Sequence, residues 1–142
     1  MQLQLAVFCD AAADYGGKLN LLGTFDTILT SHLPAIHPQC ALAVRLTFQK
    51  HEEGRHVLKL AIVDEDGRPV VTPSLELQMD VNVPEDSIFL SRNAIVNMQN
   101  LTFEKAGLYS VEISVSGIRL GNIPLLIKQV NPKSHTQPQG PS

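Results

Sequence analysis

Alternation of apolar and polar side chains is the dominant pattern along this chain. The clearest case is the run Leu75-Glu-Leu77-Gln-Met79-Asp-Val81-Asn-Val83, in which every second side chain is apolar. Successive side chains of a β-strand point to opposite faces of a sheet, so this period of two predicts a half-buried strand. The same alternation predicts that Leu3, Leu5, Val7 and Cys9 share one face of a first strand. It also occurs in residues 40–48, and further apolar or alternating runs cover residues 18–30, 56–64, 93–103, 108–116 and 119–130.

Segments rich in Gly, Asp and Pro separate these runs. They are residues 15–17, 34–38, 52–54, 64–67, 84–86, 106–107 and 116–117. These residue types supply the backbone angles that chain reversals need, and no stretch shows a sustained helical period. About eight strands at short spacing predict an all-β fold, a single antiparallel β-sandwich, in one domain over residues 1–130. Residues 131–142 hold three prolines among polar or small residues and are predicted to be a disordered tail.

One segment resembles a known sandwich in detail. Val96-x-Met98-x-x-Leu101, followed by Ala106-Gly107-x-Tyr109-x-Val111, resembles the corner between two strands of immunoglobulin domains. The resemblance implies that the ring of Tyr109 is buried and that its hydroxyl bonds back across the corner. Lys105 stands where those domains usually have Asp, Val111 replaces their second disulfide cysteine, and the chain has no Trp. The expectation is therefore an immunoglobulin-like sandwich without the disulfide.

Over residues 1–130 the chain also resembles a family of short bacterial proteins that carry a domain of unknown function. The resemblance is carried by Cys9-Asp10-Ala-Ala, Lys18-Leu-Asn-Leu-Leu-Gly23, Pro34-Ala35, Glu53-Gly54-Arg55-His56, Val63-Asp-Glu-Asp-Gly67, Gly107-x-Tyr109 and Leu120-Gly121-x-x-Pro124-Leu125. It implies a fold and a bacterial origin, and no activity.

Charge and hydropathy argue against two classes of partner. The net charge is -3 with a pI near 5.9, and the Lys and Arg residues are scattered singly. A nucleic-acid binder normally gathers basic residues on one surface, so no nucleic-acid partner is expected. There is no apolar run of about 18 residues, so no membrane association is expected either. The N-terminal segment lacks the basic start of a signal peptide, which favours a cytoplasmic location.

The two cysteines, Cys9 and Cys40, fall on strand positions that are expected to point inward. Two cysteines are too few for a disulfide scaffold, and an unexported protein keeps its thiols reduced. The sequence therefore predicts two buried free thiols rather than a disulfide or a reactive site.

Two polar loops contain residue types that bind metals. His51 and His56 are five apart around Gly54, whereas zincins place two histidines four apart on a helix. They are expected in a charged turn, with weak chelation across two strands as the alternative. Asp64-Glu65-Asp66-Gly67 lacks the spacing of a helix-flanked calcium loop and is read as an Asp-Gly turn. The alternative there is a calcium ion held with help from Asp10, Asp14 or Asp86.

No catalytic pattern is found. Ser31 and His32 lie in a loop near Pro34, there is no nucleophile elbow, and Gly16-Gly17 is too short to cradle a phosphate. Aromatic residues make up only 5% of the chain, which argues against a stacking platform for sugars.

The preferred hypothesis is a non-enzymatic binding or interaction module with a protein partner, either self or other. This hypothesis assigns the chain no catalytic, cofactor-binding or metal-binding residues and no cofactor. Outward apolar residues such as Val57, Ala61 and Val63 motivate it, because a partner would cover them. The alternative is a small hydrolase or metal-dependent enzyme whose site is assembled from loops. The residues available to form such a site are those of the acidic loops together with His32, His37, His51 and His56.

Overall fold

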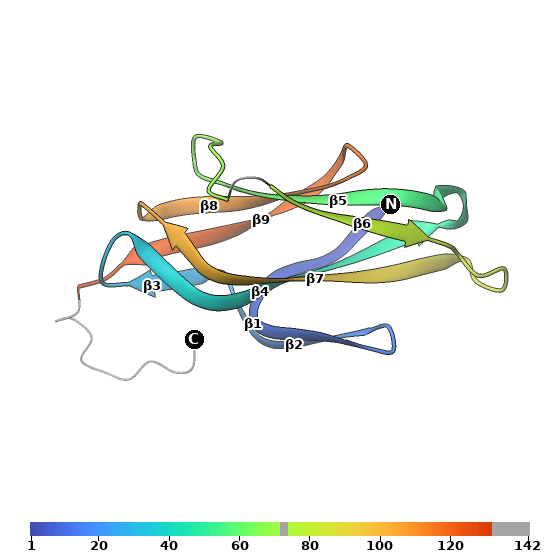
Figure 1. Ribbon diagram of the computed structural model, residues 1–142, viewed down its shortest axis with the longest axis horizontal. Helices are drawn as coiled ribbons and strands as arrows, with labels where there is room; N and C mark the ends of the chain where they lie inside the picture. Colours follow the sequence, from blue (N-terminus) through green and yellow to red (C-terminus); the bar gives the residue numbers. More distant parts are fainter. Residues whose placement is uncertain (72–73, 132–142) are drawn as a thin grey trace.

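The computed structural model describes residues 1–71 and 74–131, and these residues form two β-sheets (Figure 1). Apart from one 3-10 turn, η1 (Lys50–Glu52), every regular element described is a strand. Sheet A contains, in spatial order, β2 (Lys18–Phe25), β1 (Gln2–Tyr15), β4 (Ala35–Gln49) and β7 (Phe89–Phe103). Sheet B contains β3 (Thr27–Thr30), β9 (Ile118–Gln129), β8 (Gly107–Val115), β5 (Gly54–Val63) and β6 (Leu75–Val81). The predicted all-β class is confirmed.

The described residues hold nine strands rather than about eight, because the run over residues 18–30 divides in two. It forms β2 in sheet A and β3 in sheet B, with Asp26 between them. β3 pairs with β9 in parallel, so the expectation of a purely antiparallel sandwich is wrong at this edge. The division lets the chain pass from one sheet to the other within a few residues.

The main core lies between the two sheets and follows the predicted alternation. In β4 the side chains of Cys40, Leu42, Val44, Leu46 and Phe48 all point into it and are at most 1% exposed. Leu58, Leu60 and Ile62 of β5 meet them from sheet B. Burying a large aliphatic or aromatic side chain stabilises the fold by about 1.5–3 kcal/mol, so this layer supplies most of the driving force.

β1 departs from the predicted alternation because it contains a β-bulge. Its register with β4 shifts between Leu3 and Leu5. One extra residue in a strand moves every later side chain to the other face. Leu3 and Phe8 therefore contact the main core, whereas Val7 and Cys9 point to the outer face of sheet A. The expectation that Leu3, Leu5, Val7 and Cys9 share one face is wrong for this reason.

The second half of β1 and the whole of β2 form a hairpin, drawn in blue in Figure 1, that curls back beneath the β4 and β7 part of sheet A. The bend occurs where Asp10 lies beside Gly23, whose φ of +69° is unfavourable for any residue with a side chain. A Cβ atom at residue 23 would also collide with the carboxylate of Asp10. The fold-back hairpin therefore depends on glycine at this position.

A second apolar cluster fills the space between the fold-back hairpin and the strands β4 and β7 of the same sheet. Its fully buried members are small: Cys9, Ala41 and Ala43. The half-buried residues around them are Val7, Ala12, Leu19, Leu21 and Ile95. Small side chains on this face of β4 let the hairpin approach the sheet closely.

Polar side chains hold the tip of the hairpin against sheet A. Arg45 of β4 donates from Nη1 to the backbone oxygen of Gly17 (2.9 Å) and to Oδ1 of Asn93 in β7 (2.7 Å). Asn93 in turn donates from Nδ2 to Oδ2 of Asp14 (3.1 Å). The pKa of the Asp14 carboxyl is lowered, first by this bond from Asn93 and then by the amide of Gly17. We call Asp14, Gly17, Arg45 and Asn93 the hairpin latch.

The predicted disordered tail, residues 131–142, lies outside the described residues except for Asn131. The prediction of one domain over residues 1–130 stays a prediction. No helix among the residues that the structure describes is long and apolar enough to cross a membrane.

Candidate functional site

Tyr109 closes the corner between β7 and β8 as the sequence predicts. Its hydroxyl donates to the backbone oxygen of Lys105 at 2.6 Å, and its side chain is only 5% exposed. The ring meets Phe103 edge-on with centroids 4.9 Å apart. Burial raises the pKa of Tyr109, and the nearby carboxylates of Asp64, Glu104 and Glu65 add to the shift. The hydroxyl therefore stays protonated and acts as a fixed donor.

Gly107 has no side chain, which leaves room at the corner for the carboxylate of Glu65. Its φ is +143°, and a Cβ atom there would lie 2.9 Å from Oε1 of Glu65. The same Oε1 accepts a hydrogen bond from the amide of Leu108 at 2.9 Å. Glu65 thus ties the loop after β5 to the first residues of β8, a contact that no sequence pattern indicated.

The loop at Asp64–Gly67 forms a turn, in agreement with the Asp-Gly turn that the sequence predicts. Oδ1 of Asp64 accepts hydrogen bonds from the amides of Asp66 (2.9 Å) and Arg68 (2.8 Å). The amide of Gly67 donates to the backbone oxygen of Asp64 at 3.0 Å. One oxygen of Asp64 is therefore committed to the fold of the turn itself.

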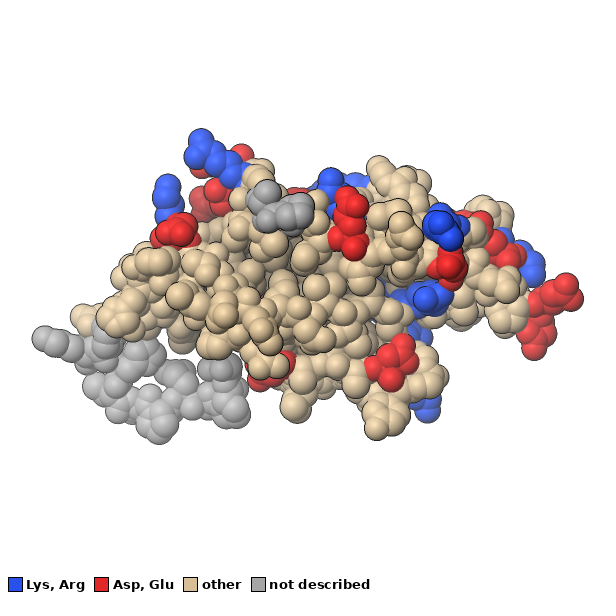
Figure 2. All heavy atoms as spheres, in the orientation of Figure 1, with Lys and Arg blue, Asp and Glu red and all other residues tan. Residues whose placement is uncertain are grey.

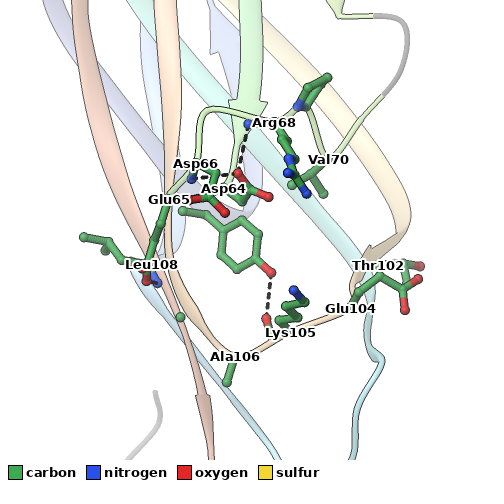
Figure 3. Close-up of a pocket in the computed structure, with 13 residues that line it drawn as sticks. Asp64, Glu65, Asp66, Arg68, Val70, Thr102, Glu104, Lys105, Ala106 and Leu108 are labelled. Carbon is green, nitrogen blue, oxygen red and sulfur yellow. Dashed lines mark hydrogen bonds between the residues drawn. The ribbon is translucent and has the colours of Figure 1, made fainter.

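Between this loop and the corner lies a cleft of about 580 Å³, shown in Figure 3. The carboxylates of Asp64, Glu65, Asp66 and Glu104 and the basic side chains of Arg68 and Lys105 line it, around the ring of Tyr109. None of the residues that the structure places along the cleft is His, Cys or Ser. The cleft therefore offers charged and hydrogen-bonding groups, among them the hydroxyl of Thr102.

The cleft continues into exposed apolar residues on the outer face of sheet B. Leu108 of β8 lies directly opposite Leu126 of β9. Leu126 in turn pairs with Thr27 of β3, and Leu29 comes two residues after Thr27 on the same face of that strand. Leu108 is 50% exposed, Leu126 is 37% exposed and Leu29 is 44% exposed. We call them the leucine strip. The sequence did not single them out, because the pairing of β3 with β9 that brings them together is long-range.

His51 and His56, which the sequence places in one charged turn, belong to two different elements of the structure. His51 lies in η1, and His56 lies in β5 with its ring 5.1 Å from that of Phe48. Nε2 of His56 donates to the backbone oxygen of Glu52 (2.6 Å), and Nδ1 lies 3.0 Å from Oγ of Ser116. Both ring nitrogens of His56 therefore form hydrogen bonds in this structure.

The other candidate ligands are dispersed over the fold. Asp10 lies at the bend of the fold-back hairpin and Asp14 at its tip, on the opposite sheet from the Asp64 loop. Asp86 lies in the loop between β6 and β7. Within residues 1–71 and 74–131 there is no group of three His, Cys, Asp or Glu residues placed to hold a metal ion.

The thiols of Cys9 and Cys40 are both free and buried. Cys9 belongs to the second cluster and Cys40 to the main core, so they lie on opposite faces of sheet A. Burial raises the pKa of Cys9, and it raises that of Cys40 to about 11. The expectation of two buried free thiols is confirmed, although Cys9 does not face the main core.

The comparison with protein families gives a match over nearly all of the described strands. The model of a family of unknown function, DUF6941, matches residues 4–128. The chain belongs to the DUF6941 family. The resemblance to proteins with a domain of unknown function is thereby confirmed, and this membership assigns no activity.

The other comparisons add little. No curated protein matches the chain. Among solved structures it is similar to Pseudomonas fluorescens alkylpurine DNA glycosylase AlkC bound to DNA containing an abasic site analog. That similarity covers 72% of this chain and 28% of the glycosylase chain, with 14% identity and a TM-score of 0.43. A likeness this distant carries no argument about activity or nucleic acid.

Proposed function

We propose that this chain is a non-enzymatic interaction module that binds a protein partner over the leucine strip and the adjoining corner cleft. The observation that carries the proposal is the position of Leu108. It belongs to the strip and also lines the cleft, so apolar and charged groups form one continuous surface. Protein interfaces commonly combine an apolar centre with a polar rim.

Charged side chains surround the leucine strip as such a rim would. Lys128 follows Leu126 on the same face of β9, and Glu112 pairs with Arg119 at 2.9 Å further along sheet B. Asp66 and Glu104 line the cleft on the other side of Leu108. Single exposed leucines are ordinary, whereas three on neighbouring strands beside a cleft favour a docking surface.

The surface is also held rigidly, which lowers the entropy cost of binding. The amide of Leu108 is fixed by Glu65, and the corner behind it is fixed by Tyr109. A site on strands with bonded backbone groups needs little reordering when a partner docks.

A differential capture experiment tests the proposal. Wild type, a Leu108→Ser/Leu126→Ser variant and a Leu22→Ser control are used as baits in extract of the source organism. Leu22 is the matched control because it is 69% exposed and lies on β2 of the other sheet. We expect a protein that is retained by wild type and the control and lost by the strip variant. Equal retention by all three baits would refute the proposal, and thermal melts check that each bait is folded.

We further propose that the two sheets form an immunoglobulin-like sandwich. The orders β1-β4-β7 and β9-β8-β5 correspond to the A-B-E and G-F-C strands of immunoglobulin domains, and the hydrogen bond from Tyr109 to Lys105 supports the correspondence. A bacterial origin and a cytoplasmic location also stay part of the proposal. The free thiols of Cys9 and Cys40 are in keeping with a reducing compartment.

A further inference from the structure

One long strand edge of the molecule has no partner in the described structure. β7 is the outermost strand of sheet A and pairs with β4 from Phe89 to Phe103. No other strand in residues 1–71 and 74–131 pairs with it, so among these residues one side of its backbone has no strand partner. A free edge offers a row of amide and carbonyl groups to another strand.

The other three sheet edges are protected by short length, charge or distortion. β3 has four residues; β6 has seven and carries Glu76 and Asp80; β2 begins at Lys18 and is bent at Gly23. β7 has fifteen residues, of which only Arg92 is charged, and it contains no proline. Figure 2 shows an uncharged band along β7, with the charged groups gathered above and below it. Natural sheets normally protect an edge of this length.

Two features limit the accessible part of this edge. At one end, Nη1 of Arg92 donates to the backbone oxygen of Asp80 at 2.5 Å and ties β7 to the end of β6. At the other end, Asn100 has a φ of +54° and lies opposite Pro38, where the ladder with β4 is interrupted. Residues 93–99, which we call the open edge, lie between these two points. They are uncharged and free of Pro and Gly, and Ile95 and Val96 at their centre are β-branched, so nothing in this stretch opposes pairing with an identical strand.

We propose that the open edge pairs antiparallel with the open edge of a second copy of this chain, about a two-fold axis near Val96. In that register Asn93 lies opposite Gln99, and the small Ala94 lies opposite the larger Met98. Arg92 lies opposite Asn100, so no like charges face each other. A groove of about 380 Å³ beside Met98, lined by Val70, Val71 and Leu75 among others, accommodates apolar side chains at this edge.

The dimer is expected to be weak. Seven residues extend over roughly 23 Å of strand, and a single added strand buries less than the standard interface of about 1,600 Å². Closed two-fold pairing also uses up both edges and stops further growth. Self-association should therefore depend on concentration and end at the dimer.

Sedimentation velocity of the full chain, from low-micromolar to near-millimolar concentration, tests the proposal. The disruptive variant is Asn97→Lys, at an exposed position of the open edge. In the paired edges the lysines of the two copies would lie diagonally across from each other, about 7–8 Å apart, and their like charges would repel. The matched control is Asn20→Lys, an exposed asparagine on β2 at the opposite edge of sheet A.

We expect wild type and Asn20→Lys to reach the dimer with the same Kd, and Asn97→Lys to weaken it at least tenfold with an unchanged Tm. The Leu108→Ser/Leu126→Ser variant should dimerise normally, which separates this proposal from the proposed function. A wild type that stays monomeric at all concentrations would overturn it. So would an Asn97→Lys variant that dimerises normally, or a control that is weakened equally.

Discussion

Sheet A has an apolar cluster on each face, and the two clusters are built differently. The main core contains large side chains such as Phe8, Phe48 and Phe103, each at most 1% exposed. The second cluster has Cys9, Ala41 and Ala43 at its centre and is closed by the exposed hairpin latch. Stabilisation by burial grows with apolar area, so the same strand, β4, has one face that drives folding and one that mainly permits close approach.

The difference implies different local stabilities. Regions with little buried apolar surface and exposed hydrogen bonds open at lower free energy than the core does. We therefore expect the fold-back hairpin to detach from sheet A without global unfolding.

Thiol labelling of the native protein should separate the two clusters most widely. Cys9 lies beneath the hairpin and Cys40 in the main core, so Cys9 should react after local opening and Cys40 only after global unfolding. We expect Cys9 to be labelled at least about ten times faster, which corresponds to about 1.4 kcal/mol. Labelling kinetics of Cys9→Ala and Cys40→Ala variants assign the two rates. Equal rates would mean that the hairpin opens only with the whole fold.

The same substitution in each cluster gives a second contrast, this time in the free energy of unfolding. Leu46→Ala leaves a cavity where the side chain is fully buried, and it should cost about 3–5 kcal/mol. Leu21→Ala in the second cluster removes a half-buried side chain at the rim and should cost about 1 kcal/mol. Urea denaturation of both variants gives the difference. Equal losses would show that the two clusters stabilise the fold alike.

Gly23→Ala tests the bend that makes the second cluster possible. Left-handed backbone costs about 1–2 kcal/mol for a residue with a side chain, and here the new methyl group also meets the carboxylate of Asp10. Gly16→Ala is the control, since Gly16 has a φ of +59° with open space around it. We expect a larger loss of stability at Gly23, partly recovered in an Asp10→Ala/Gly23→Ala double variant. Equal losses at both glycines would leave backbone strain alone as the cause.

Tyr109→Phe probes the corner, which belongs to the main core. The variant keeps the packing against Phe103 and removes the donor to the oxygen of Lys105. The expected cost is about 1–3 kcal/mol in denaturant melts. A change of only a few tenths of a kcal/mol would show that the hydroxyl does not stabilise the corner.

The smallest effect concerns pH and the hairpin latch. The pKa of Asp14 is lowered from its ordinary value of 3.8, so its contribution is present above that value. The contribution is lost as the pH falls through the lower, folded-state pKa. Hydrogen exchange of the hairpin amides should therefore rise at acid pH, relative to sheet B. An Asp14→Asn variant should remove this extra pH dependence, and an unchanged profile in the variant would point to another group.

The sequence was sufficient for features that depend on local pattern. Alternation identified residues 40–48 of β4, the strand β6 and the core side of Leu42, and the resemblance to the immunoglobulin corner implied the bond made by Tyr109. Residues 35–38, assigned to a turn because of nearby prolines, belong to β4 instead. It was insufficient where one residue changes the register, as at the bulge before Leu5, because the alternation there looks continuous. The leucine strip and the contact of Glu65 with Leu108 depend on strands that are distant in the chain, and no local pattern encodes such pairing.

The parallel pairing of β3 with β9 has a consequence for synthesis on the ribosome. Thr27 to Thr30 pair with Leu126 to Gln129, at nearly opposite ends of the described chain. Sheet B cannot be completed until Gln129 has emerged, and non-local pairing of this kind slows folding. During translation we therefore expect the apolar faces of the earlier strands to be exposed, a state in which a chain is prone to aggregate.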